Sequence, residues 1–265
     1  MRRRIFICFL LAAAFGKGTD AAGQAQSYPR TIRWLKDGAE MIFIPAGEFP
    51  MGSNQFEPNE KPAHKVLVKD YYIDKYELTN DKYFRFCRET GRPLPMHMRE
   101  LQAVPAGRGN HPVNHVSFYD GEAYCQWAGK RLPTEEEWEK AARDADSRTY
   151  PWGSGWDQHL SNNRTSPAED TLPVGSIPRG ASPYGLMDMA GNVWEWTNSW
   201  FKSYPGAERQ FDETGKNKVV RGGAYFYSIE LLRTTYRHPL PPDDRSEYGG
   251  FRCAVDTDQV KLNPK

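Results

Sequence analysis

The amino-acid sequence predicts an α+β domain with little regular secondary structure and long loops. Three observations favour this class. The 265 residues include 23 glycines and 20 prolines, which interrupt regular elements. Aromatic residues make up 13% of the chain, so large rings with polar edges can fill the core. Three segments carry helix-start signals, and short apolar runs typical of strands lie on both sides of them.

The first 25 residues are expected to be a secretory signal peptide. Three arginines at positions 2–4 precede an apolar run from Ile5 to Gly16, and small and polar residues follow. The run is too short to span a bilayer comfortably, and this order is typical of a cleaved export signal. An uncleaved anchor is the alternative. We expect an exported protein, periplasmic or secreted, with no membrane association after cleavage. Arg3-Arg4 loosely matches a twin-arginine signal, so the export route stays open.

The net charge bears on which partners are expected, and the cysteine count bears on how many disulfides can form. The formal net charge is +1, which gives no electrostatic reason to expect a nucleic acid or an anionic membrane as partner. Cys8 lies in the predicted signal peptide, so Cys87, Cys125 and Cys253 remain after cleavage. An oxidising compartment favours one disulfide and leaves one thiol over.

The mature chain is expected to begin with strands and one helix. Residues 41–45 form an apolar run closed by Pro-Ala-Gly, and residues 66–68 and 71–73 are also strand-like. Thr79-Asn80 opens an amphipathic helix that ends at Gly91. Residues 92–114 show little periodicity and are expected to form a surface loop over a site or a partner face.

Two further helices and two strands complete the expected elements. Ser117 and Asp120 can cap a helix that stops at Gly129. Thr134 begins another with acidic residues in its first turn and Glu137 at the capping-box position, and it extends to about residue 143. Residues 145–215 are expected to be loops and short strands, and residues 219–225 and 250–255 core strands. The chain shows no internal repeat and no linker-like segment, so one domain over residues 38–256 is expected, followed by a tail at 257–265.

A series of short motifs occurs in order along residues 38–256. The most specific are Gly191-Asn192-Val193-Trp194-Glu195-Trp196 and Gly250-Phe251-Arg252-Cys253-Ala254, and others lie at 43–52, 77–80, 111–113, 123–138, 151–153 and 184–192. With this set the chain resembles the sulfatase-modifying-factor family, which includes the formylglycine-generating enzymes. The resemblance implies a C-type-lectin-like fold, with two helices, a small sheet and long loops.

The segment after Gly222-Gly223 departs from the pattern of the formylglycine generators. Those relatives carry a serine, a cysteine and a second cysteine five residues later, and the two thiolates hold copper(I), a soft ion that prefers sulfur. Ala224, Tyr227 and Leu232 stand at these positions here, and no cysteine occurs between residues 126 and 252. We therefore expect that copper is not bound by a cysteine pair and that formylglycine is not generated.

The resemblance also implies roles for the remaining cysteines. Cys125 and Cys253 match a pair that forms a disulfide in relatives. Cys87 lies on the apolar side of its expected helix, so a buried small side chain is favoured over a reactive thiol.

Two calcium sites are expected from oxygen-rich loops and from the resemblance. Asn192 and Glu195 flank Val193 and can place side-chain and carbonyl oxygens around a hard cation. A second site matches Asn162, the carbonyl of Asn163, and Asp170. The alternatives are a turn role for Asn192 and an arginine partner for Glu195.

Three histidines could in principle bind a redox metal. His97, His111 and His115 lie close in the sequence, but His111-Pro112 breaks helical spacing, so a structural role is favoured. The sequence assigns no redox metal.

Two functional hypotheses remain. The first is a metal-dependent oxidase, similar to exported family members tied to maturation of the pyoverdine chromophore. Its site would lie beside Gly222-Gly223 and be lined by Tyr225, Tyr227, Trp196 and Arg237. Tyr227 would donate a hydrogen bond or an electron, although simple packing of a buried ring is the more common role of such a tyrosine. The second hypothesis is a non-catalytic module that binds a ligand or a protein. A small-molecule or peptide ligand is expected in either.

Overall fold

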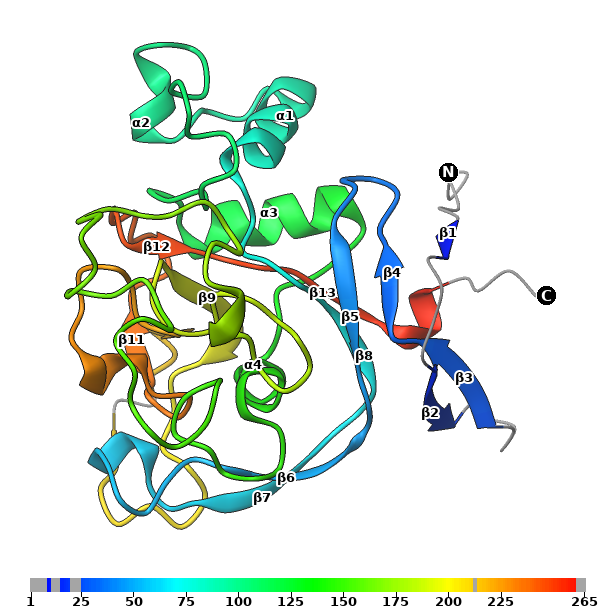
Figure 1. The fold of residues 1–265 in the computed structure, drawn as a ribbon, viewed down its shortest axis with the longest axis vertical. Coiled ribbons are helices and arrows are strands. Elements are labelled where there is room, and N and C mark those ends of the chain that lie inside the picture. Colours follow the sequence, from blue (N-terminus) through cyan, green and yellow to red (C-terminus); the bar gives the residue numbers. More distant parts are fainter. Residues whose placement is uncertain (1–8, 11–14, 20–24, 212–213, 261–265) are drawn as a thin grey trace.

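The computed structural model describes residues 9–10, 15–19, 25–211 and 214–260. Long loops connect short strands and helices, as Figure 1 shows. The described residues include four α-helices. This agrees with the loop-rich α+β class predicted from the glycine, proline and aromatic content. None of the helices in these described ranges is both long and apolar enough to cross a membrane.

A five-stranded antiparallel sheet joins the two ends of the described chain. Its order is β1 (Phe9–Leu10), β4 (Thr31–Arg33), β5 (Glu40–Ile44), β8 (Tyr71–Asp74) and β13 (Ala254–Asp256). β5 and β8 match the strands expected at 41–45 and 71–73. β1 and β2 (Phe15–Thr19) fall within the predicted signal peptide, and β2 pairs with β3 (Ala25–Pro29). Most of residues 1–25 lie outside the described residues, so cleavage and export stay predictions.

A second sheet carries the motifs that mark the resemblance. Its order is β11 (His238–Leu240), β10 (Lys218–Arg221), β9 (Trp194–Trp200) and β12 (Gly249–Gly250). β12 runs parallel to β9, and the other pairs are antiparallel. β10 ends at Arg221, earlier than the expected 219–225, because Gly222 and Gly223 both adopt a positive φ. The strand expected at 250–255 is divided into β12 and β13.

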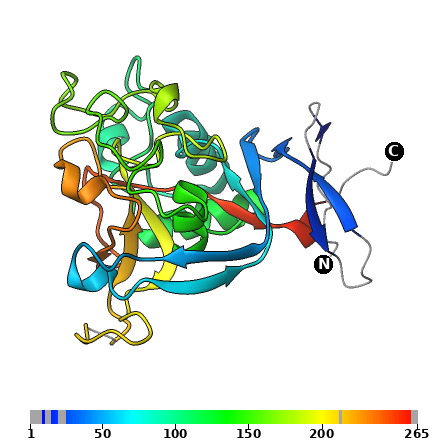
Figure 2. The ribbon, with the colours of Figure 1, turned by 60° about the horizontal axis from the view of Figure 1, so that its bottom comes forward.

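A long two-stranded ribbon borders this part of the molecule. β6 (Gly47–Met51) and β7 (His64–Val68) pair along five residues, and Figure 2 shows the ribbon running across the lower part of the molecule. A short 3-10 helix, η1 (Pro58–Glu60), lies in the connection between its strands. Further 3-10 turns are η2 (Pro178–Gly180), η3 (Ile229–Leu232) and η4 (Thr257–Gln259).

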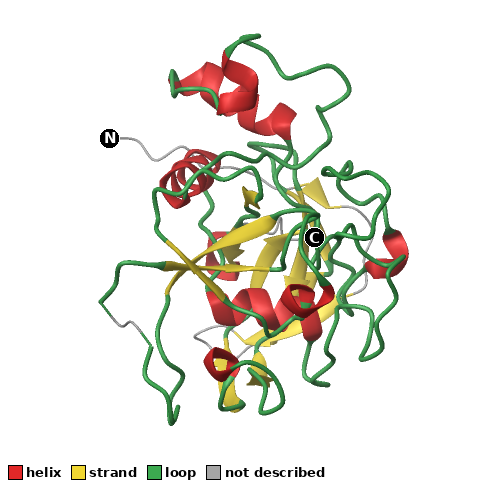
Figure 3. Cartoon of the chain, turned by 90° about the vertical axis from the view of Figure 1, so that its left-hand side faces the viewer, coloured by secondary structure: helices red, strands yellow, loops and turns green. Residues whose placement is uncertain are grey.

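Three of the four helices in the described residues begin and end where the sequence signals indicated. α1 (Asn80–Thr90) and α3 (Phe118–Ala128) end at glycines in the left-handed conformation, Gly91 and Gly129. Capping boxes begin α3 at Ser117 and α4 (Glu135–Arg143) at Thr134. α2 (Met96–Arg99) lies within residues 92–114, which were expected to be loop throughout. Figure 3 shows helices and loops surrounding the strands.

The disulfide implied by the resemblance is present. Cys125 in α3 and Cys253 just before β13 are joined, with their Cα atoms 5.9 Å apart. Both are buried in a core that includes Tyr83, Tyr124 and Phe251. Cys87 is free and buried, and burial raises its thiol pKa to about 11. It therefore stays protonated at neutral pH and packs as a small apolar side chain.

Candidate functional site

The loop that follows β10 turns sharply at two glycines. A Cβ atom on Gly223 would lie 2.9 Å from the carbonyl oxygen of Leu231 and 3.1 Å from the side chain of Leu232. The loop therefore closes tightly onto η3. The amide of Tyr225 donates to the carbonyl of Asn192, which fixes the start of the loop against the Gly191-Asn192 turn.

Four aromatic rings gather where this loop reaches the surface. The ring centroids of Tyr225, Phe226 and Tyr227 each lie 5.5 Å from that of Tyr248, and Phe226 stacks on it. Tyr227 also packs edge-on against Trp194. The Phe226 ring is 58% exposed. We call Tyr225, Phe226, Tyr227 and Tyr248 the aromatic cluster.

Two phenols of this cluster, those of Tyr225 and Tyr248, are neutral at ordinary pH. Burial, and then the Glu247 carboxylate, raise the pKa of Tyr225 to about 12. Burial and a hydrogen bond with Glu247 raise the pKa of Tyr248 to about 12. The cluster thus offers aromatic faces together with protonated hydroxyl groups, which suits a planar or aromatic ligand.

Two residues expected to line this site lie in the interior instead. Trp196 is fully buried in β9 and donates from Nε1 to the carbonyl of Val116. Arg237 is 2% exposed, and its guanidinium bonds both carboxylate oxygens of Glu135 at 2.6 and 2.7 Å. The structure therefore does not bring Trp196 and Arg237 to the surface beside Tyr225 and Tyr227.

Glu195, expected as a calcium ligand, forms a buried ion pair. The guanidinium of Arg252 donates to both of its carboxylate oxygens, at 2.6 and 2.7 Å, and Trp138 donates from Nε1 at 2.8 Å. Both side chains of the pair are fully buried. This is the arginine-partner arrangement that the sequence left open for Glu195.

Asn192 joins several loops. Its φ is 63°, and its Oδ1 accepts from Asn162 Nδ2 at 3.1 Å and from the amide of Leu172 at 2.9 Å. Its Nδ2 donates to Glu77 at 2.5 Å, and the amide of Val193 donates to the same carboxylate. The Asn192 side chain thus performs the loop-bonding role that was the alternative to calcium binding.

The second expected calcium group is only partly brought together. The Oδ1 atom of Asn162 is buried and has no hydrogen-bond partner among the residues that the structure describes. The Asn163 carbonyl accepts from the amide of Ser166. Asp170 approaches Asn162 through its backbone carbonyl, at 2.9 Å, while its half-exposed carboxylate pairs with Arg108.

Gly191 allows the Asn162 loop to approach this closely. Its φ is +83°, and a Cβ atom there would lie 2.0 Å from the carbonyl oxygen of Asn162. Its amide donates to the carbonyl of Gly222. A side chain at position 191 would therefore separate the loops that Asn192 connects.

One buried and one partly buried acid lie beside these residues. Glu77 is fully buried, and burial together with the Asp188 and Glu195 charges raises its pKa well above the usual range. Burial raises the pKa of Asp188 to about 6, although the Gly175 amide donates to its carboxylate at 2.7 Å. The charges of Glu195, Glu77 and Asp188 thus all act on the guanidinium of Arg252.

The three histidines do not meet at one point. The rings of His97 and His115 lie 5.5 Å apart, while His111 bonds the Thr171 hydroxyl through Nδ1. In the part of the chain that the structure describes, no three His, Cys, Asp or Glu side chains are grouped closely enough to hold a metal ion.

Residues 30–257 match the model of the sulfatase-modifying factor enzyme 1-like domain. This chain belongs to that family. The chain is 32% identical to the formylglycine-generating enzyme of Mus musculus, over 90% of this chain and 82% of the relative. It is 33% identical to hercynine oxygenase of Mycolicibacterium smegmatis, over 81% of this chain and 61% of that longer protein.

A solved family structure confirms the fold. PvdO from Pseudomonas aeruginosa superposes with a TM-score of 0.71 and 26% identity, covering 85% of this chain and 97% of PvdO. The C-type-lectin-like arrangement, with few helices and curled sheets, is therefore the fold of this family member.

Several residues around the aromatic cluster and the Asn192 loops are not indicated as site residues by the sequence. Glu77 and Asp188 lie inside motif segments that carried the resemblance, so their positions were available as a signal, but their burial was not. Trp194 lies in the best-matching motif. Tyr248 precedes Gly249-Gly250, and nothing local in the sequence indicated that it meets Tyr225 and Tyr227.

Proposed function

We propose that this protein is an exported, oxidase-type member of the family that acts without a copper-binding cysteine pair, comparable to oxidases of the pyoverdine-maturation type. Its ligand, a small molecule or a peptide, would bind at the aromatic cluster. The observation that carries the proposal is the position of Tyr227 in this cluster. It occupies the loop after Gly222-Gly223, where the resemblance places the first copper-binding thiolate.

The cysteines of this chain support the absence of that copper chemistry. Position 227 is a phenol, and position 232 is a buried leucine. Cys125 and Cys253 are joined to each other, and Cys87 is a buried, protonated thiol. A phenol and a hydrocarbon cannot replace two thiolates as ligands for a soft cation.

One relative supports the oxidase hypothesis. It is by name an oxygenase, so the family is not restricted to formylglycine generation. In this chain the aromatic cluster would hold the ligand by stacking on Phe226 and Tyr248, and the Tyr227 hydroxyl would donate a hydrogen bond or an electron. Oxygen is the electron acceptor in this proposal.

The proposal includes a structural calcium ion near Asn162, Asn163, Asp170, Asn192, Val193 and Glu195. Two observations support a fit. Asn162 Oδ1 is buried without a partner among the described residues, and negative charges on Glu77, Asp188 and Glu195 would repel one another, which adds to burial in raising the pKa of Glu77 and of Asp188. A divalent cation prefers such oxygen donors and would neutralise that charge. The Asp170 carbonyl, rather than its carboxylate, faces Asn162.

The second candidate is a ligand- or protein-binding module without catalysis. The exposed Phe226 ring, stacked on Tyr248, favours it because an exposed aromatic surface is typical of binding sites. The fold of the family is suited to displaying loops for recognition.

Oxygen uptake separates these candidates. The purified protein is incubated with phenolic and peptide compounds, with metal content measured, and both oxygen consumption and binding are followed. Turnover that falls in Tyr227→Phe and Phe226→Ala supports the oxidase. Saturable binding without turnover, weakened by Phe226→Ala, supports the binding module. Leu67→Ala, a matched change at a 72% exposed apolar residue, is the control. If neither turnover nor binding is observed, both candidates are contradicted. The same holds if Leu67→Ala causes the same loss as the variants of the aromatic cluster.

A further inference from the structure

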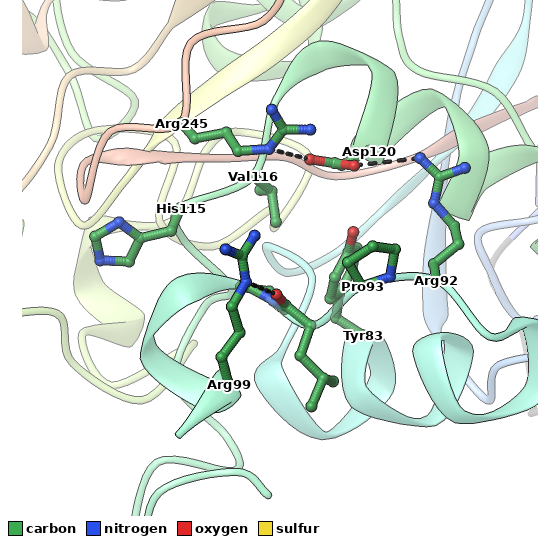
Figure 4. Close-up of a pocket in the computed structure, with 10 residues that line it drawn as sticks. Tyr83, Arg92, Pro93, Arg99, His115, Val116, Asp120 and Arg245 are labelled. Carbon is green, nitrogen blue, oxygen red and sulfur yellow. Dashed lines mark hydrogen bonds and ion pairs between the residues drawn. The ribbon is translucent and has the colours of Figure 1, made fainter. Parts of the chain in front are cut away.

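A pocket separate from the aromatic cluster lies between α1, α2 and the start of α3. It has a volume of about 330 Å³ and is lined by Arg92, Arg99 and Arg245 together with His115, Asp120 and Tyr83. Pro93, Leu94, Pro95 and Val116 complete its walls. Figure 4 shows the guanidinium groups of Arg92 and Arg245 on either side of Asp120, with that of Arg99 below them. We call it the arginine pocket.

Local structure places the three arginines here. Arg92 directly follows the left-handed Gly91 that ends α1, and Arg99 is the last residue of α2, which begins after Pro95. Arg245 comes from the connection between β11 and β12. Two of these side chains are positioned by the same acceptor, since Arg92 Nη2 lies 3.2 Å and Arg245 Nε 2.9 Å from the Asp120 carboxylate.

Asp120 cannot neutralise all of this positive charge. Its carboxylate already accepts from the amide and the hydroxyl of Ser117 in the capping box of α3. Although burial alone would raise the pKa of Asp120, these bonds and the Arg245 guanidinium lower it, so the group is ionised. Three guanidinium groups therefore face one carboxylate, which leaves an excess of positive charge at the pocket.

Most N–H groups of the three guanidiniums have no acceptor within the described residues. Arg99 donates from Nε to the carbonyl of Leu94 at 2.7 Å, and Arg92 and Arg245 each donate through one nitrogen to Asp120. The Nε of Arg92 is buried and unpaired. Each guanidinium has five N–H donors in a planar fork, so several remain for a ligand.

Tyr83 adds a neutral donor at the pocket wall. It is 1% exposed, and burial, followed by the Asp120 charge, raises its pKa above the usual range. Its hydroxyl hydrogen is therefore retained. Buried Leu94 and Val116 form an apolar part of the wall of the same space.

We propose that the arginine pocket binds a small oxyanion, a carboxylate or phosphate group, through the free N–H groups of Arg92, Arg99 and Arg245. Guanidinium forks bind both groups through paired hydrogen bonds. The volume suits a small ligand or the terminal group of a larger one. This site does not depend on the function proposed for the aromatic cluster.

Binding of inorganic phosphate and of succinate to the full chain tests the proposal. Each is titrated by calorimetry at constant ionic strength, because exposed charges are screened by salt. Saturable binding with a dissociation constant below about 10 mM is expected for at least one of them. The ligand that binds more tightly identifies the group as tetrahedral or carboxylate. Absence of saturable binding of both overturns the proposal.

Arg99→Gln is the informative variant. Arg99 is exposed, and among the described residues its side chain bonds only the Leu94 carbonyl. Its replacement should therefore leave the fold intact, which thermal unfolding checks. Loss of one charged donor should weaken binding by about tenfold. The control is Arg179→Gln, which removes the same charge from an exposed residue of η2 and should change the affinity by less than about twofold.

Two comparisons complete the test. Unchanged affinity in Arg99→Gln, or equal weakening in Arg179→Gln, would mean that binding reflects overall charge and would overturn the site. Phe226→Ala should bind the oxyanion as the wild type does, because Phe226 does not line the arginine pocket. Its failure to do so would contradict the independence of the two sites.

Discussion

In the interior around α4 and β9, buried arginines each bond a glutamate, whereas in the arginine pocket one aspartate bonds two of the three arginines and the third bonds a backbone carbonyl. Arg252 pairs with Glu195, Arg237 with Glu135, and Arg221 with Glu139, all of them buried. Their remaining N–H groups mostly meet backbone carbonyls, as Arg252 does at Asp74, Lys75 and Met187. Such paired arginines hold loops together. The pocket arginines keep free donors, which is the arrangement that a ligand can use.

Breaking a pair in the interior should have the largest effect. Arg252→Met leaves Glu195 buried without its cation, beside Glu77 and Asp188. Removal of one partner of a buried pair costs about 3–5 kcal/mol, so the free energy of unfolding in urea should fall by that amount. Arg179→Met, at an exposed position, should change it by less than about 0.5 kcal/mol. A loss below 1 kcal/mol in Arg252→Met would contradict a structural role for the pair.

The disulfide ties α3 to the last strand across the same interior. Cys125 and Cys253 are 128 residues apart in sequence, so replacing both by alanine should lower the free energy of unfolding by about 2–5 kcal/mol. Peptide mapping without reductant should recover this crosslink and show Cys87 alkylated only after denaturation. A crosslink that contains Cys87 would be inconsistent with the structure.

A bound calcium ion would provide a second cation for the Glu77 and Asp188 carboxyl groups, which lie beside the Glu195–Arg252 pair. If the ion binds only the folded protein, addition of calcium at about 100 times its dissociation constant should stabilise by about 2.7 kcal/mol. Chelation should reverse the gain in thermal unfolding. Asp188→Asn, similar in shape but uncharged, should lose most of the response. An unchanged melting temperature with chelator, together with no calcium by elemental analysis, would refute the site.

His97, on the arginine-pocket side of the molecule, should have a smaller effect on the free energy of unfolding, and this effect should depend on pH. Burial, followed by the His115 and Arg108 charges, lowers its pKa to about 4. In the unfolded chain, protonation begins near the usual 6.5, so the stability from neutral His97 is present above pH 6.5 and is lost as the pH falls towards 4. Because this side chain is partly exposed, a contribution of about 1 kcal/mol is expected. His97→Gln should lack it in urea unfolding at pH 7 and pH 4.5, and equal pH dependence would disprove it.

The smallest expected effect is none. The protein should not convert a Cys-x-Pro-x-Arg peptide into formylglycine, because positions 227 and 232 provide no thiolate for copper. Incubation with copper and a reductant, followed by mass spectrometry, checks the product. Aldehyde formation above a heat-inactivated sample would show that this chain retains the chemistry by another route.

Local features of the fold could be predicted from the sequence. Thr134 with Glu137, Ser117 with Asp120, and the glycines at 91 and 129 determine helix ends through bonds within a few residues. β5 and β8 followed from apolar runs. The seven-residue β9 was not singled out within residues 145–215, because its place in the sheet depends on pairing with distant strands.

The sites depended on contacts that no local pattern reveals. Glu195 was expected to bind a cation, but the arginine that holds it lies 57 residues further along the chain. Arg237 and Trp196 are expected from the sequence to line the groove beside Gly222-Gly223, yet Glu135 and the Val116 carbonyl hold these side chains inside. Arg92 and Arg245 meet only because Asp120 lies between them.

Asn192 connects the Asn162 loop to the loop that begins the aromatic cluster. Its amide donates to the carbonyl of Asn162, and its own carbonyl accepts from the amide of Tyr225. Because Gly191 has no side chain, the Asn162 loop lies in direct contact with it. A cation that shifted the Asn162 loop would therefore shift the start of the aromatic cluster. By thermodynamic linkage, a ligand held by Tyr225 and a cation held by Asn162 would each change the affinity for the other by the same factor.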